Sequence, residues 1–109
     1  MRAAVVASCT AGGRCGTKAL RTRDMLLTEA PRRGTDSASV LTEEQQPREL
    51  LLDPAAEPVK IRRPKGIERQ WQLLCRSCNA VLAYRSADPK YLYVHADKLK
   101  LAGEGGRSS

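Results

Sequence analysis

The sequence predicts a small, mainly β fold of the zinc-ribbon-like type, built from β-hairpins and a Cys-x-x-Cys knuckle. Three observations predict it: residues alternate between polar and apolar from Ile67 onward, Cys75 and Cys78 have a knuckle spacing, and every aromatic residue follows Gln70. A chain of 109 residues provides one small domain with a marginal hydrophobic core. A metal-bound knuckle would add stability to such a domain.

Residues 1–14 are predicted to be a flexible N-terminal segment that begins a cytosolic protein. Met1 to Arg23 contains basic and small residues but no acid, which is also the composition of an organelle transit segment. The apolar run Ala3 to Ala7 is too short for a secretory signal, and no run approaches the roughly 18 apolar residues of a membrane-spanning helix. Import of a reporter fused to this segment would separate the two interpretations.

The predicted domain spans residues 15–97 and includes a proline-rich linker at 31–58. Residues 98–109, which end in a Gly- and Ser-rich stretch, are predicted to be a disordered tail. Because prolines interrupt the linker, no long helix or strand is expected in it. Thr42 to Gln45 fits a capping box, which predicts a short helix there.

Three strands are predicted in the C-terminal half of the chain. The second continues the alternation through residues 80–84, and the third covers 91–95 after an Asp-Pro turn at 86–90. The first begins at Ile67 and is expected to be half-buried. Its predicted core face comprises Ile67, Trp71, Leu73 and Cys75, and its predicted solvent face comprises Glu68, Gln70 and Gln72.

The four cysteines are candidates for one structural zinc site. At the spacing of Cys75 and Cys78, a hairpin turn directs two thiolates at one ion, and Asn79 readily adopts the left-handed conformation required after the second cysteine. Structural zinc takes four ligands, so Cys15 and Cys9 are the candidates for the other two.

Several alternatives to a complete four-cysteine site remain open. Cys9 and Cys15 are separated by more residues than in an ordinary zinc knuckle, although the Gly after Cys15 matches the Asn after Cys78. His95 is an alternative fourth ligand. The C-terminal knuckle alone would otherwise fold without metal, or would form a thioredoxin-like redox pair, for which the βαβ context is missing.

The formal net charge of +7 favours an acidic partner. Cations gather just before and within the first predicted strand, and an extended loop of such residues would bind nucleic-acid phosphates or anionic lipid headgroups. The alternative is that these side chains form surface ion pairs with Glu68. The candidate binding residues are Arg62, Arg63, Lys65 and Arg69.

The sequence contains no recognisable catalytic pattern. No Ser-His-Asp order, carboxylate pair in a pocket-like context or phosphate-cradling glycine loop is found, so we expect a protein that is not an enzyme.

One long segment resembles a known family. The run Arg62 to Gln70, followed by Trp71, Cys75-x-x-Cys78 and Leu82-x-Tyr84-x-Ser86, is similar to the core of the STING ER exit protein family. The similarity extends more weakly to cover about residues 15–97. Two features depart from the family pattern. Gly13 stands where the family has the first cysteine of a Cys-x-Cys-Gly motif, which leaves Cys9 to replace it, and the family's acidic region and helical C-terminal extension are not found in this chain.

The resemblance implies an adaptor for the exit of a membrane cargo protein from the endoplasmic reticulum, with a protein partner in the secretory pathway. It also implies a cytoplasmic location peripheral to that membrane, and a nuclear location has been linked to the family. From the residues alone, the basic charge and the knuckle support a second hypothesis, a nuclear zinc-ribbon-like protein associated with RNA or DNA. No small-molecule substrate is expected.

Overall fold

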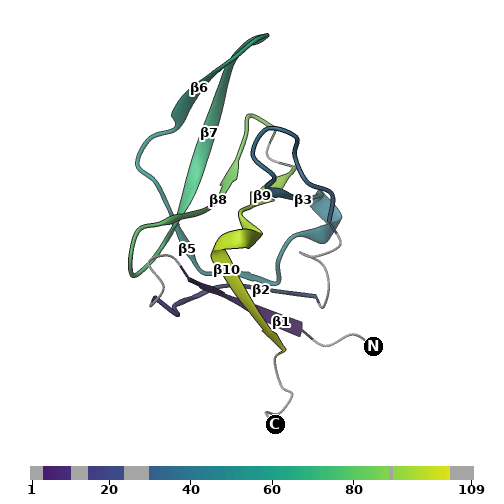
Figure 1. Ribbon diagram of the computed structural model, residues 1–109, viewed down its shortest axis with the longest axis vertical. Coiled ribbons are helices and arrows are strands. Elements are labelled where there is room, and N and C mark those ends of the chain that lie inside the picture. Colours follow the sequence, from purple (N-terminus) through teal and green to yellow (C-terminus); the bar gives the residue numbers. More distant parts are fainter. Residues whose placement is uncertain (1–3, 11–14, 24–29, 89, 104–109) are drawn as a thin grey trace.

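The computed structural model describes residues 4–10, 15–23, 30–88 and 90–103 (Figure 1). This part of the chain is mainly β, as predicted, and contains no α-helix; no helix in it is long and apolar enough to cross a bilayer. The strands are β1 (Ala4–Cys9), β2 (Lys18–Arg23), β3 (Ser39–Leu41), β4 (Glu49–Leu50), β5 (Leu52–Pro54), β6 (Val59–Arg63), β7 (Gly66–Cys75), β8 (Val81–Arg85), β9 (Leu92–Val94) and β10 (Leu99–Gly103). Two 3₁₀ helices, η2 (Glu43–Gln45) and η3 (Ala96–Lys98), connect them.

The first sheet has the strand order β10-β1-β2-β4 and joins the two ends of the described chain. β1 is antiparallel to β10, with Cys9 opposite Leu99, and its other edge pairs with β2. Ala7 and Cys9 alternate into the core and are fully buried, as the period of two in a strand requires.

This sheet corrects the expected domain boundaries. β1 lies within the segment 1–14 that was expected to be flexible, and β10 lies within the tail 98–109 that was expected to be disordered. Each strand is ordered by a partner about ninety residues away, which a local pattern cannot reveal. Residues 1–3, 11–14 and 104–109 of these segments lie outside the described residues.

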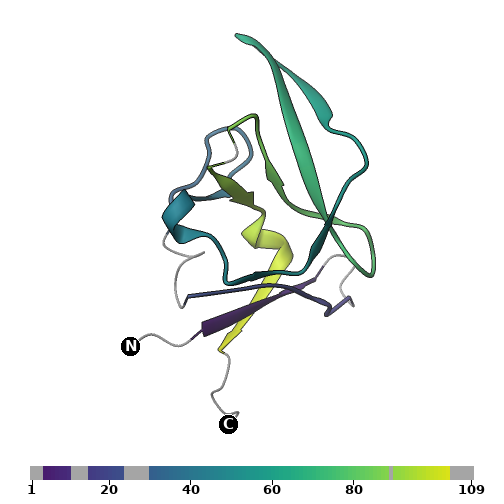
Figure 2. The same ribbon diagram turned by 180° about the vertical axis from the view of Figure 1, so that it is seen from behind.

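The second sheet has the order β3-β9-β8-β7-β5, and β6 also pairs with β7. β7, β8 and β9 correspond to the three strands predicted in the C-terminal half of the chain. β5 pairs with the C-terminal end of β7, at Leu73 to Cys75, and β6 pairs with its N-terminal end, at Gly66 to Gln70. The β6–β7 hairpin therefore extends past the rest of the sheet and projects from the body of the molecule (Figures 1 and 2).

The chain passes between the two sheets several times, and two of these connections are short. Leu51 alone separates β4 in the first sheet from β5 in the second, and its N–H donates to the carbonyl of Ala19 at 2.7 Å. The helix η3 joins β9 to β10. Buried side chains from both sheets form one core, which includes Ala7, Leu20, Leu41, Leu82, Leu92 and Val94.

The proline-rich segment 31–58 is part of the fold and does not act as a linker between folded parts. It contributes β3, η2, β4 and β5, all only two or three residues long, as the proline spacing predicted. The predicted capping box forms, because the Gln45 side chain accepts a hydrogen bond from the N–H of Thr42 at 3.2 Å. The three short strands of this segment are ordered by pairing with strands from other parts of the chain.

The N-terminal half of β7 is turned the opposite way from the prediction. Ile67 is 65% exposed and Trp71 is 42% exposed, whereas Gln70 is buried and Glu68 is half-buried. Hydrophobicity favours the predicted orientation, but ion pairs satisfy Glu68 inside the fold and hold the polar face inward. Only the C-terminal end follows the prediction, because Cys75 is buried and Leu73 packs against the core.

Candidate metal centre

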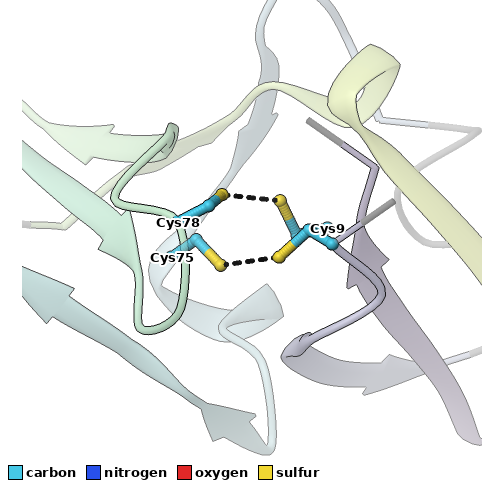
Figure 3. Close-up of side chains that lie close together, drawn as sticks. Cys9, Cys75 and Cys78 are labelled. Carbon is cyan, nitrogen blue, oxygen red and sulfur yellow. Dashed lines mark hydrogen bonds between the residues drawn. The ribbon is translucent and has the colours of Figure 1, made fainter. Parts of the chain in front are cut away.

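The C-terminal knuckle connects β7 to β8. Cys75 ends β7, its N–H donates to the carbonyl of Ala80 at 2.9 Å, and the N–H of Asn79 donates back to the carbonyl of Cys75 at 3.0 Å. Asn79 has φ +62°, the left-handed conformation expected of it from the sequence. These bonds fix Cys78 in the turn beside Cys75, and the sulfurs of both residues point to the same side (Figure 3).

The N-terminal knuckle, between β1 and β2, repeats the same hydrogen bonds. The N–H of Cys9 donates to the carbonyl of Thr17 at 2.8 Å, and the N–H of Gly16 donates to the carbonyl of Cys9 at 2.8 Å. Gly16 has φ +67° and so corresponds to Asn79. Cys9 and Cys15 therefore occupy positions equivalent to Cys75 and Cys78, although their loop is longer.

The two knuckles face each other and bring four sulfurs together. The Sγ atoms of Cys9, Cys15, Cys75 and Cys78 all lie within 4.8 Å of one another. Two of the separations cross between the knuckles, at 3.6 Å from Cys9 to Cys78 and 3.4 Å from Cys15 to Cys75 (Figure 3). A tetrahedral zinc ion with 2.3 Å bonds spaces its sulfurs about 3.8 Å apart, within this range. The donor set therefore fits a zinc ion.

The structure places the predicted ligands as follows. Cys9 contributes the fourth sulfur, so the cluster does not depend on a cysteine at position 13, and Gly13 itself lies outside the described residues. His95 is not a member of the cluster; its ring lies 5.5 Å from that of Tyr84, and burial lowers the pKa of its imidazole.

Two hydroxyl side chains that the sequence analysis did not single out border the sulfurs. Thr17 donates to Oγ of Ser77 at 2.7 Å and so links the two knuckles directly. The N–H of Ser77 lies 3.4 Å from the sulfur of Cys75. The sequence could have indicated both residues by their positions, two residues after Cys15 and two after Cys75. Hydroxyls and amides near a knuckle commonly bond to its sulfurs.

Hydrogen bonding divides the thiols into more and less acidic ones. The side chain and backbone of Thr17 lower the pKa of Cys15 to about 6, with a further contribution from Cys75. The backbone of Ala80 and the thiol of Cys9 lower the pKa of Cys78, but desolvation and the thiols of Cys15 and Cys75 raise it by more, so the net shift is upward. Zinc binds thiolates, so the lowered pKa of Cys15 would favour zinc binding by this cluster.

A site of this kind would be structural. Four cysteine ligands complete a tetrahedral zinc shell and leave no open position for water or substrate, which a catalytic zinc requires. The ligands would come in two pairs from different sheets, so a bound ion would join the β1–β2 connection to the β7–β8 connection.

The predicted binding residues are divided between the two faces and the turn of the β6–β7 hairpin. Arg62 and Arg69 are exposed, and Lys65 lies exposed at the turn. Arg63 points to the interior side, where its Nε lies 2.9 Å from Glu68. Arg63 therefore forms the ion pair with Glu68 that the alternative interpretation of the basic residues predicted.

Arg33 is a further residue that the sequence analysis did not assign to this region. Its guanidinium donates to Glu68 at 2.8 Å and to the hydroxyl of Tyr84 at 2.8 Å, and it lies 4.7 Å from the centroid of the Tyr93 ring. Tyr84 in turn donates to Asp36 at 2.6 Å. Burial and the bond to Asp36 raise the pKa of Tyr84 to about 12. Through the Arg33–Glu68 bond, this network joins the β6–β7 hairpin to the loop before β3.

Two β-sheets that meet at a four-cysteine cluster define a small zinc-ribbon-like β protein. The family model of the STEEP1 domain matches residues 7–107, nearly the whole chain. The chain therefore belongs to the STEEP1 domain family, which confirms the resemblance and extends it beyond residues 15–97 at both ends. No curated protein matches the chain.

Proposed function

We propose that this chain is a non-enzymatic adaptor for the exit of a membrane cargo protein from the endoplasmic reticulum, built around one structural zinc ion. The observation that carries the zinc site is the convergence of four sulfurs from two facing knuckles. Membership in the STEEP1 domain family supports the class of function. The protein works on the cytoplasmic side of the membrane and contacts a protein partner of the secretory pathway.

Zinc supplies stability that the small core lacks. Structural zinc sites in small domains contribute on the order of 10–16 kcal/mol of apparent binding free energy, which is realised as folding free energy. Cys9, Cys15, Cys75 and Cys78 would hold the ion, and the hydroxyls of Thr17 and Ser77 would support the two knuckles from outside.

Metal analysis of the purified protein tests the zinc site. We expect stoichiometric zinc in the wild type and loss of zinc in Cys9→Ser and in Cys75→Ser, because each removes a ligand from a different knuckle. Arg76→Ala is the matched control, since it alters the same turn without removing a sulfur and breaks only an exposed ion pair with Asp53, and it should keep its zinc. Zinc retained by Cys9→Ser would show that Cys9 is not a ligand.

A trafficking assay tests the adaptor role. In cells that lack their own family member, the wild-type chain should restore movement of a tagged membrane cargo such as STING from the endoplasmic reticulum to the Golgi, measured by imaging. Cys75→Ser should fail to restore it, whereas Arg76→Ala should succeed. Normal cargo exit in cells that express only the Cys75→Ser protein, or none restored by the wild type, would contradict the proposal.

A second candidate function is a nuclear protein associated with RNA or DNA. The exposed cations Lys60, Arg62 and Arg69, close to the exposed Trp71, favour it, because cations and aromatic rings together bind nucleic acids. Titration with single-stranded RNA at increasing salt tests this function. Affinity that falls steeply with salt would support it, and no binding at low ionic strength would exclude it.

A further inference from the structure

One face of the β6–β7 hairpin combines cations with exposed apolar side chains. Residues directly opposite in an antiparallel pair share a face, and the register places Lys60 opposite Arg69 and Arg62 opposite Ile67. Trp71 follows Arg69 by two residues and shares that face. All five side chains are exposed, and we name this surface the outer face.

The outer face carries positive charge without acid. Glu68 is the acidic residue of the hairpin, residues 59–71, and it lies on the opposite side, where Arg33 and Arg63 pair with it. Lys65 adds another exposed cation at the turn. The charge of the outer face is therefore uncompensated within the hairpin and complements an anionic surface.

The two apolar side chains of this face are unusually exposed. Ile67 is 65% exposed beside the turn, and Trp71, 42% exposed, lies four residues further along the same strand. Four residues of strand span about 13 Å, so both side chains can enter one flat interface together. An indole ring with an apolar body and one N–H is suited to the headgroup layer of a bilayer.

The position of the hairpin makes this face accessible to an extended surface. The hairpin projects from the body of the molecule in both views, along the longest axis of 49 Å (Figures 1 and 2). The network of Arg33, Glu68 and Tyr84 holds its inner side against the fold. The outer face is the opposite side of the hairpin from this network, so it is the side that a planar partner can approach.

We infer that the outer face docks on an anionic lipid bilayer. Ile67 and Trp71 enter the interfacial layer, and Lys60, Arg62 and Arg69 contact the anionic headgroups. A bilayer fits better than nucleic acid because Ile67, the more exposed apolar side chain, has no π face on which a base stacks, and strand-binding surfaces use several aromatic rings. This inference rests on the proposed function and identifies the surface that the adaptor binds.

Binding of the whole 109-residue chain, loaded with zinc, to vesicles tests the inference. Trp71 is the single tryptophan of the chain, so its fluorescence reports on the outer face alone. Vesicles of phosphatidylcholine mixed with phosphatidylserine should shift the emission of Trp71 to shorter wavelength, and brominated lipids should quench it. Vesicles of phosphatidylcholine alone should bind far more weakly, because each cation near an anionic surface contributes about fivefold to binding.

Variants on the two faces provide matched comparisons. Arg62→Ala/Arg69→Ala should weaken binding about 30-fold, since two cations are removed. Lys98→Ala/Lys100→Ala removes two exposed cations from outside the hairpin and should leave binding unchanged. Ile67→Ser should weaken binding, whereas Val59→Ser, which removes an exposed apolar residue from the inner side of the same hairpin, should not. Retained zinc and an unchanged circular dichroism spectrum confirm folding of each variant.

Several outcomes would overturn the inference. These are no emission shift with anionic vesicles, equal loss of binding in the outer-face and control variants, or a shift with single-stranded RNA but not with vesicles. The proposed function is tested separately: vesicle binding with failed cargo exit contradicts only the adaptor role, and cargo exit without vesicle binding contradicts only the docking surface.

Discussion

Glu68 is the acid around which the inner side of the β6–β7 hairpin is organised. Its side chain is 14% exposed and pairs with Arg33 at 2.8 Å and Arg63 at 2.9 Å. Burial alone would raise its pKa, but hydrogen bonds from Arg33, Arg63 and Gln70 outweigh burial and lower the pKa to about 2. The carboxylate is therefore charged in the folded protein over the whole physiological range.

Replacement of this carboxylate should destabilise the fold in a pH-dependent way. We expect Glu68→Gln to lower the free energy of unfolding by about 2 kcal/mol at pH 7, because two half-buried guanidinium groups lose their counterion. The folded pKa lies below the ordinary value of 4.5, so the stabilisation is complete above pH 4.5 and declines as the pH falls toward about 2. Urea unfolding across this range measures both effects.

Glu49→Gln is the control for this experiment. Glu49 pairs with Arg21 at 3.4 Å, but both side chains are more than one-third exposed, so the change should cost well under about 1 kcal/mol. A Glu68→Gln variant that is equally mild, or whose cost does not shrink below pH 4.5, would show that the network does not hold the hairpin.

At the scale of the elements, the two knuckles form one repeated unit with different loop lengths. Both place a residue of positive φ directly after the second cysteine, Gly16 at +67° and Asn79 at +62°. The hydrogen bonds around Cys9 and Cys75 are the same in both. The shared backbone geometry, more than the cysteine spacing, defines the unit.

The backbone requirement at Gly16 predicts a specific cost. An added Cβ would meet no atom within 4 Å, so Gly16→Ala should lower the free energy of unfolding through its conformation alone, by about 1 kcal/mol. Gly34→Ala is the matched control, since its site is equally open and its φ is not positive. Equal stability of the two variants in thermal unfolding would show that the left-handed turn is not required.

The knuckle residues illustrate how local chemistry can be recognised from sequence. Cys75, Cys78 and Asn79 predicted a turn, and the Gly after Cys15 predicted its counterpart, because backbone strain and ligand spacing act over a few residues. The partner Cys9 was a candidate only by elimination. Its position depends on the pairing of β1 with β2 and β10, and that pairing brings together distant parts of the chain.

At the scale of the whole molecule, the cysteine cluster lies where the two sheets meet. β4 and β5 join the sheets through Leu51, and η3 joins them between β9 and β10. A zinc ion at the cluster would add a metal-mediated connection between the sheets, from the β1–β2 loop to the β7–β8 loop.

Removal of metal should therefore loosen both sheets together. We expect a chelator to abolish cooperative thermal unfolding and to reduce hydrogen-exchange protection in β1 and β2 as well as in β7 and β8, since the proposed zinc links them. Exchange mapped by mass spectrometry measures this effect, and added zinc should restore protection. Loss confined to the β7–β8 turn would show that the ion does not connect the sheets.

The sequence by itself determined the class of the protein, the three C-terminal strands and the knuckle at Cys75 and Cys78. These features depend on side-chain alternation and turn chemistry between near neighbours. Only the tertiary structure decided that both ends of the described chain share a sheet and that Ile67 and Trp71 face outward. The physical reason is that these features depend on contacts between residues far apart in the sequence. Arg33, 35 residues away, holds Glu68 inward, and this ion pair outweighs the opposite orientation that the local hydrophobic pattern favours.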